Sequence, residues 1–160
     1  MRDELVAIAA DAGQPSLVRR RALESTAVFG ALPDMIELIR AAYDGDDDGL
    51  RAGALYAMGR TLDRRWLNVL LAELESPDAE MRYEAARACG ELGDASAVES
   101  LARCGLDNDA EVRQAAITAL GRIGSNAAAR ALRVLAETAR PADREAFDEA
   151  LDEATSDDDL

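Results

Sequence analysis

The strongest constraint on this chain is a short pattern that recurs with a period of 31 residues. Arg51, Arg82 and Arg113 lie 31 residues apart. Each arginine follows an apolar residue, and alanine stands three and six residues after it, with glycine eight residues after it. A period of this length indicates an array of stacked repeats, because a single repeat cannot bury its apolar face alone.

Each copy of the pattern predicts a helical hairpin. The apolar positions lie at −1, +3, +4 and +7 from the arginine, on one face of a 3.6-residue helix. We expect the recurring glycine to end this first helix, where a left-handed residue is often needed. A second helix follows with the same period. The predicted N-caps are Asp47, Asp78 and Asp109 for the first helices, and Asp63, Asp94 and Ser125 for the second.

These patterns predict an all-α fold, a right-handed α-solenoid of about four helical hairpins over residues 1–154. Residues 2–12 are predicted to be the second helix of an N-terminal half repeat. A C-terminal capping helix is predicted from Pro141, with Ala146, Phe147, Ala150 and Leu151 on its apolar face. Residues 155–160 are predicted to be an acidic disordered tail.

The repeats carry a resemblance to a known family. The string DAEMRYEAARACGELGDASAVESL and the later DNDAEVRQAAITALGRIG resemble HEAT-like repeats of the short phycobilisome-lyase type. The resemblance covers about residues 16–140. It implies a stack whose second helices line the concave, protein-binding side. It also allows an alternative function, a phycobilin lyase or lyase-like chaperone, which an absorbance shift on adding a bilin would reveal.

The composition argues against several classes of partner. The net charge is −14, and all 18 basic residues are arginine. Nucleic acid and anionic membranes need a basic surface, so neither is expected as a partner. The N-terminus does not read as a signal peptide, and no segment is long enough to cross a membrane. Cys89, aligned with core positions, and Cys104, at a predicted edge, are too few for a disulfide framework. We therefore expect a cytoplasmic protein.

No residue pattern predicts catalysis. The chain has no histidine, which removes the commonest general base and most zinc sites. We therefore expect a protein that is not an enzyme and has no cofactor. The run from Asp44 to Gly49 resembles a calcium loop, but it lacks the required spacing and final glutamate, so a turn that caps the next helix is predicted. The arginine column is predicted to form a ladder of ion pairs with Asp47, Asp78 and Asp109 of the same or adjacent repeats, with ligand binding as the alternative.

The second helices carry the predicted binding surface, because apolar residues recur on the side opposite their core stripe. Trp66 is the predicted anchor, although Trp66 and Met35 could instead fill gaps between adjacent helices. Repeat four continues the strip with Ala131 and Val134. The predicted binding residues are Met35, Leu38, Trp66, Val69, Ala72, Arg103, Arg130 and Arg133.

This strip predicts a scaffold or adaptor, expected to be a monomer, that binds another protein or a peptide segment. The segment would be amphipathic. Its apolar side would lie near Leu38, Trp66 and Val69, and its acidic end near the three arginines. A regulatory subunit of a larger assembly is a further alternative.

Overall fold

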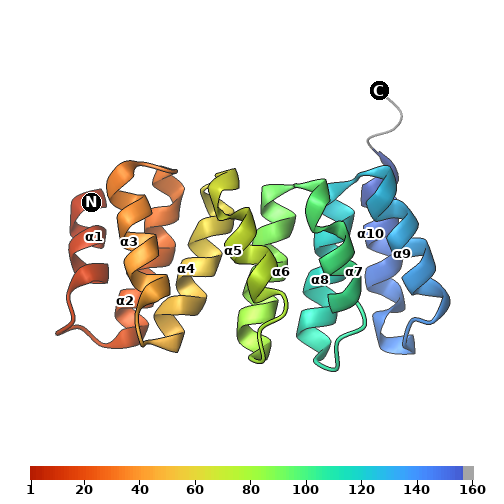
Figure 1. Ribbon diagram of the computed structural model, residues 1–160, viewed down its shortest axis with the longest axis horizontal. Coiled ribbons are helices and arrows are strands. Elements are labelled where there is room, and N and C mark those ends of the chain that lie inside the picture. The colour runs from red at the N-terminus through yellow and green to blue at the C-terminus, as the bar shows by residue number, and fades with distance from the viewer. Residues whose placement is uncertain (157–160) are drawn as a thin grey trace. The chain divides into compact units, whose positions relative to one another are not determined.

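The computed structural model describes residues 1–156, and within that range the chain forms ten α-helices and four short 3-10 helices, with no strand (Figure 1). It divides into two compact units, residues 1–66 and 67–160. The N-terminal unit holds α1 (Arg2–Ala10), α2 (Ser16–Thr26), η1 (Ala27–Phe29), α3 (Pro33–Asp44), α4 (Asp48–Arg60) and η2 (Arg64–Trp66). The C-terminal unit holds α5 (Leu67–Glu73), α6 (Ala79–Leu92), η3 (Ala95–Ala97), α7 (Val98–Cys104), α8 (Ala110–Ile123), α9 (Asn126–Glu137), η4 (Pro141–Asp143) and α10 (Arg144–Ser156).

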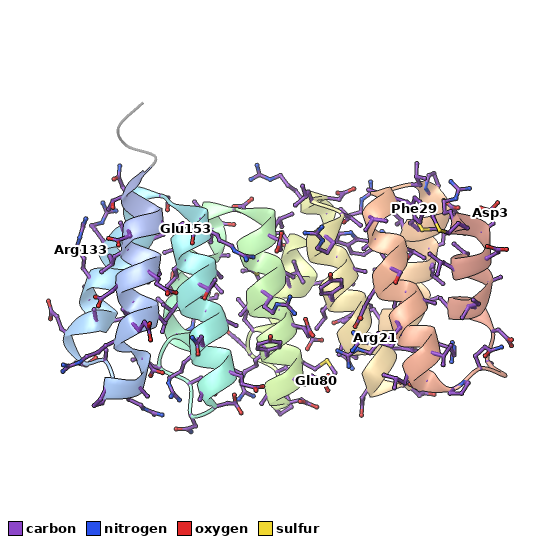
Figure 2. The ribbon with its side chains drawn as sticks, turned by 180° about the vertical axis from the view of Figure 1, so that it is seen from behind. Asp3, Arg21, Phe29, Glu80, Arg133 and Glu153 are labelled. Carbon is purple, nitrogen blue, oxygen red and sulfur yellow. The ribbon has the colours of Figure 1, made fainter. Side chains whose placement is uncertain are left out.

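Within each unit the helices stack as repeated hairpins. In the C-terminal unit the first helices α6, α8 and α10 pack on one another in order, and α5, α7 and α9 each pack on the first helix that follows. Figure 1 shows these second helices as the front layer, and Figure 2 shows the first helices from behind. In the N-terminal unit α2 packs on α4, while α1 and α3 pack on α2 and α4. The all-α solenoid architecture predicted from the 31-residue period is confirmed.

The alanine columns form the core, as the register of the repeats requires. The side chains of Ala54, Ala85 and Ala116 are fully buried. Because alanine is small, neighbouring helices approach closely along these columns, and an added methylene group has little room. The alignment on the arginines therefore identifies the inward face of each first helix correctly.

The predicted role of the recurring glycine is wrong. α6 continues two residues past Gly90 and ends at Leu92, and its left-handed C-cap is Gly93, with φ of 67°. A Cβ at Gly90 would lie 2.8 Å from the Cα of Ala119 in α8. The glycine is needed inside the helix because the backbones of adjacent first helices nearly touch there. Gly121 has the same relation to Ala150 of α10, at 2.9 Å, while Gly124 caps α8.

The predicted N-caps are confirmed. The carboxylate of Asp47 accepts from the backbone N–H of Leu50 at 3.0 Å, and Asp78 and Asp109 cap α6 and α8 in the same way. Asp63, Asp94 and Ser125 accept backbone N–H groups at the starts of the second helices. Asp47 also accepts from the hydroxyl of Ser16 at 2.8 Å. The acidic run before α4 is thus a capping turn.

The C-terminal helix covers α8 with the apolar face predicted for it. Phe147 and Ala150 are each 3 % exposed. A 3-10 turn at Pro141–Asp143 leads into α10, which continues to Ser156, so the first two residues of the predicted tail are helical. The rest of that tail, residues 157–160, lies outside the described residues.

Candidate functional site

The arginine column holds the turns between repeats together. Arg82 donates through Nε and Nη2 to the two carboxylate oxygens of Asp107, at 2.8 and 3.0 Å. Its Nη1 donates to the backbone carbonyls of Ser76 and Pro77, at 2.8 and 3.1 Å. The predicted ion pair with Asp78 is therefore wrong, because that carboxylate caps α6 and the arginine reaches the turn of the next repeat instead.

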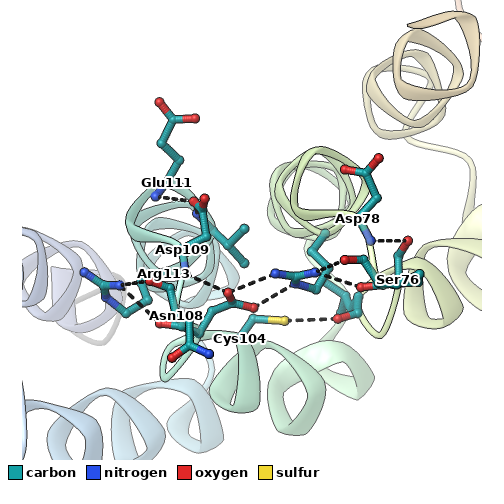
Figure 3. Close-up of polar contacts among 12 residues, drawn as sticks. Ser76, Asp78, Cys104, Asn108, Asp109, Glu111 and Arg113 are labelled. Carbon is teal, nitrogen blue, oxygen red and sulfur yellow. Dashed lines mark hydrogen bonds and ion pairs between the residues drawn. The ribbon is translucent and has the colours of Figure 1, made fainter. Parts of the chain in front are cut away.

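Arg113 repeats this arrangement one repeat later (Figure 3). Its Nε donates to Asp143 at 2.8 Å, and its Nη1 donates to the carbonyls of Asp107 and Asn108, both at 3.1 Å. Asp109, its predicted partner, caps α8. In the N-terminal unit the guanidinium of Arg51 lies 4.9 Å from the centre of the Tyr43 ring. Arg82 and Arg113 therefore have structural roles in the turns.

The Arg82–Asp107 pair changes the ionisation of both groups. The hydrogen bonds from Arg82 lower the pKa of the Asp107 carboxyl below its ordinary value, against the opposing effect of its partial burial. The same hydrogen bonds raise the pKa of Arg82. Both charged forms are therefore favoured in the folded chain.

Two of the predicted binding residues are buried, so they cannot be exposed contacts for a partner. Trp66 is 3 % exposed and Met35 is fully buried. Trp66 lies in the tight turn η2 rather than within a regular second helix, and its ring packs inward, with the guanidinium of Arg40 5.8 Å from the ring centre. The alternative in which these two side chains fill the interior therefore holds, and the tryptophan anchor is wrong.

The other predicted binding residues differ in exposure. Leu38 and Val69 are half-buried. Ala72 and the three arginines Arg103, Arg130 and Arg133 are exposed. Of these residues, Arg103 and Arg130 line the same surface hollow, which lies between α7 and α9 in the C-terminal unit.

This α7/α9 hollow has a volume of about 470 Å³ and an apolar floor. Leu106, 62 % exposed, and Val134, 65 % exposed, are its large apolar side chains. A smaller hollow of about 360 Å³ lies on the other side of Arg103, toward Glu75. The α7/α9 hollow is lined by Glu99, Ala102, Arg103, Leu106, Arg130, Ala131, Val134 and Leu135.

The positive charge at this surface comes from α9. Arg103 is already neutralised, because it donates to Glu99 at 3.0 Å and to Glu75 at 3.1 Å. Among residues 1–156 no carboxylate forms an ion pair with Arg130 or Arg133 (Figure 2 labels Arg133). The net charge of the chain is −14. Arg130 and Arg133 therefore place positive charge beside exposed apolar side chains on an otherwise acidic protein.

Sequence reasoning found Val134 on the second-helix strip but missed Leu106, which lies just after α7. The missed signal is in the repeat columns. Positions aligned with Leu106 carry Asp44, Glu75 and Glu137, so repeat three has an apolar residue where the others have an acid. An exposed apolar residue in an otherwise acidic column indicates a contact surface.

Both cysteines are buried. Burial raises the pKa of the Cys89 thiol to about 12 and that of the Cys104 thiol to about 11. Cys89 belongs to the core as predicted, but the edge position predicted for Cys104 is wrong. Its Sγ lies 3.5 Å from the carbonyl oxygen of Leu74, beneath the end of α5. Neither thiol is an exposed nucleophile.

Residues 1–156 bring together no group of three or more histidine, cysteine or acidic side chains suited to a metal ion. None of the helices in that range has the length and apolar character to span a membrane.

Comparison with known proteins identifies the family. Residues 67–152, more than half of the chain, match HEAT repeats, and the chain belongs to this family. It is 36 % identical over 99 residues to the deoxyhypusine hydroxylase of Bos taurus, an alignment covering 61 % of this chain and 32 % of that enzyme. The chain thus spans about a third of the length of this relative.

Solved structures confirm the fold. An engineered protein matches with a TM-score of 0.68 at 22 % identity, over 97 % of this chain and 79 % of its own. A designed armadillo repeat protein in complex with the peptide (KR)4 matches with a TM-score of 0.64 at 18 % identity, over 94 % and 80 %. Human deoxyhypusine hydroxylase matches with a TM-score of 0.57 at 18 % identity, over 96 % and 73 %. At these identities the likeness concerns the fold alone.

Proposed function

We propose that this chain is a non-enzymatic protein-binding scaffold that holds a segment of another protein on the α7/α9 hollow. The observation that carries the proposal is the exposure of Leu106 and Val134 in a hollow of about 470 Å³. A volume of this size accepts one large side chain or a small cluster of them. Apolar side chains buried in such hollows supply most of the binding energy of protein interfaces.

The charges beside the hollow define the chemistry of the segment. Arg130 and Arg133 favour carboxylates, so the segment carries an apolar anchor next to aspartate or glutamate. The designed armadillo protein binds the basic peptide (KR)4, and the cations on α9 favour the opposite sign here. Exposed ion pairs contribute little affinity, about 0–1 kcal/mol each. The acidic residues therefore serve orientation and rate of association, while the apolar anchor supplies the affinity.

The test uses random peptides displayed on phage and selected against the whole chain. Enriched peptides are synthesised with a fluorescent label and titrated by fluorescence anisotropy against the wild type and two variants. Leu106→Glu installs the residue type found at the aligned Glu75 and Glu137, and Val134→Asp places a charge on the opposite wall. Leu62→Glu is the matched control, because Leu62 is equally exposed at 62 % and belongs to the N-terminal unit.

We expect enriched peptides to combine a large apolar residue with acidic residues. Leu106→Glu and Val134→Asp should each weaken their binding at least about tenfold, which corresponds to about 1.4 kcal/mol. Leu62→Glu should bind as the wild type does. Peptides that bind equally well to all three variants would place the binding surface elsewhere.

The second candidate is an activity related to that of the bovine relative, which the 36 % identity favours. Against it stands the absence of histidine from this chain. Mass spectrometry of a deoxyhypusine-containing protein after incubation with the chain tests it. A gain of one oxygen atom would support hydroxylation, and an unchanged mass would count against it. The bilin absorbance test described above remains the check on the lyase alternative.

A further inference from the structure

Residues 157–160, here called the DDDL segment, have the chemistry that suits the α7/α9 hollow. They lie outside the described residues, and their sequence is three aspartates followed by Leu160. The hollow offers the exposed side chains of Leu106 and Val134. Beside them stands Arg130, which forms no ion pair with a carboxylate of residues 1–156. The DDDL segment thus combines an apolar anchor with the charge opposite to that of α9.

The spacing within the segment also matches the spacing on α9. Arg130 and Val134 both line the hollow. They are four residues apart, so they lie on one face of the helix, about 6 Å apart along its axis. An extended segment advances roughly 6.6 Å over two residues and points their side chains to the same side. With Leu160 against Val134, Asp158 therefore lies level with Arg130.

The segment is too short to place Leu160 in the hollow of its own copy. α9 and α10 pack on each other and are joined by a short connection, so they run antiparallel, and α10 ends level with the start of α9 (Figure 1). Val134 lies eight residues after Asn126, about 12 Å along α9. The hollow is on the α7 side of α9, so the path from Ser156 must also cross that helix, which is about 10 Å wide. Four residues span at most about 14 Å.

We propose that the DDDL segment of a second copy of this chain occupies the α7/α9 hollow, with Leu160 between Leu106 and Val134, and Asp158 beside Arg130. This rests on the proposed function, because it uses the same hollow and the same recognition chemistry. Four residues bury far less than the roughly 800 Å² per partner of a standard interface, so the dissociation constant is on the order of 10⁻⁴ M.

This self-association departs from the monomer expected from the sequence. It also regulates the hollow, because one hollow holds either the DDDL segment of another copy or the segment of a partner protein. A partner that binds more tightly than the DDDL segment displaces it, and partner binding therefore dissociates the copies.

The first test is fluorescence anisotropy with a labelled peptide of residues 153–160, blocked at both ends and titrated with the whole chain. We expect Leu106→Glu and Val134→Asp in the chain each to weaken binding at least tenfold, and the control Leu62→Glu to leave it unchanged. A peptide carrying Leu160→Asp keeps the aspartates and should also lose at least tenfold. A wild-type chain that does not bind the peptide at about 10⁻³ M, or a Leu160→Asp peptide that binds equally well, would overturn the proposal.

A charge swap tests the register of the segment in the hollow. Arg130→Glu in the chain should weaken binding of the wild-type peptide severalfold. A peptide carrying Asp158→Arg should bind this variant better than the wild-type peptide does. The matched control is a peptide carrying Asp157→Arg, because residue 157 points to the opposite side of an extended segment. Equal recovery by both peptides would contradict the register.

Sedimentation velocity of the whole chain identifies the copy that supplies the segment. Over about 10⁻⁵ to 10⁻³ M we expect the wild type and Leu62→Glu to associate with rising concentration, and Leu160→Asp to remain monomeric. A wild type that binds the peptide but stays monomeric throughout would overturn the role of a second copy.

Failure of this inference is distinguishable from failure of the proposed function. Selected foreign peptides that bind the hollow, while the peptide of residues 153–160 does not, would overturn the inference alone. If the peptide of residues 153–160 binds in the hollow and no foreign peptide is selected, the proposed function fails and the inference stands.

Discussion

The side chain of Asp107 binds Arg82, and the backbone carbonyl of the same residue accepts from Arg113. One turn residue thus joins the arginines of two successive repeats (Figure 3). The side-chain bond joins the turn to α6, and the backbone bond joins the turn to α8, the first helix of the following repeat. Stacking in this unit therefore depends on a polar relay through the turns as well as on the alanine core.

The relay predicts a pH-dependent loss of stability in Asp107→Asn. Because Arg82 lowers the pKa of Asp107, the carboxylate stabilises the folded state above its unfolded pKa of about 3.9, and this stability is lost as the pH falls through the folded value. At pH 7 the variant should lose about 1–3 kcal/mol of unfolding free energy. Urea denaturation followed by circular dichroism measures this.

The difference between wild type and Asp107→Asn should shrink as the pH falls below the unfolded pKa and through the lowered folded pKa of Asp107, where the wild type loses the charge as well. Asp148→Asn is the control, since Asp148 is exposed on α10. A deficit of the same size at every pH would mean that the ionisation of Asp107 is irrelevant to stability.

Gly90→Ala should destabilise the stack, although alanine favours helix by about 1 kcal/mol over glycine. The new Cβ would lie 2.8 Å from the backbone of Ala119, which cannot move aside without shifting α8. We expect a net loss of about 1–3 kcal/mol in urea denaturation. Gly105→Ala is the comparison, because its Cβ would lie 2.9 Å from the flexible end of Leu135 and no closer than 3.3 Å to a backbone atom, the carbonyl oxygen of Ala102. Equal losses in both variants would argue against the backbone clash.

Trp66→Ala should unfold the chain more readily instead of selectively weakening binding. Removing a buried aromatic side chain costs about 3–5 kcal/mol, and Trp66 is 3 % exposed. Thermal unfolding by circular dichroism checks this, with Trp66→Phe expected to retain more of the stability. An unchanged melting temperature in Trp66→Ala would indicate that the side chain of Trp66 is exposed and not part of the core.

Neither thiol should react with thiol reagents while the chain is folded. With pKa values of about 12 for Cys89 and about 11 for Cys104, neither forms thiolate near neutral pH. Ellman's reagent at pH 8 should label neither thiol until denaturant is added. Both folded values exceed the unfolded value of about 8.5, so the folded state keeps these protons and its stability should fall as the pH rises above that value. Rapid labelling of the native chain would show that a thiol is accessible.

The periodic part of the fold was predictable because its causes are local and repeated. Capping aspartates such as Asp109 and core alanines such as Ala116 stand in columns that one alignment reveals. The role of the glycine column was predicted wrongly from the sequence, because a glycine near the end of a helix resembles a C-cap. Only the three-dimensional stack reveals that Gly90 meets Ala119 of another helix.

The candidate site was predictable only in part. The strip on the second helices includes Val134 and Arg130, which do line the hollow. Trp66 was misassigned because helical periodicity assumes a regular helix, whereas the chain there forms a 3-10 turn that rotates the ring inward. Leu106 lies after the helix, where periodicity carries no information, and only comparison between repeats singles it out.

Charge reversal at Arg133 should change the rate of binding of an acidic, apolar peptide more than the lifetime of its complex. Arg133 is exposed and does not line the hollow, so its charge affects mainly the rate at which the peptide associates. Leu106 and Val134 contact the apolar anchor of the peptide, so they affect mainly the rate at which it dissociates. Stopped-flow fluorescence with a selected peptide should give a severalfold slower association for Arg133→Glu and a weaker dependence of that rate on salt. Leu106→Glu should instead accelerate dissociation. If Arg133→Glu mainly accelerated dissociation, the arginine would be part of the anchored contact, and the division between steering and anchoring would be wrong.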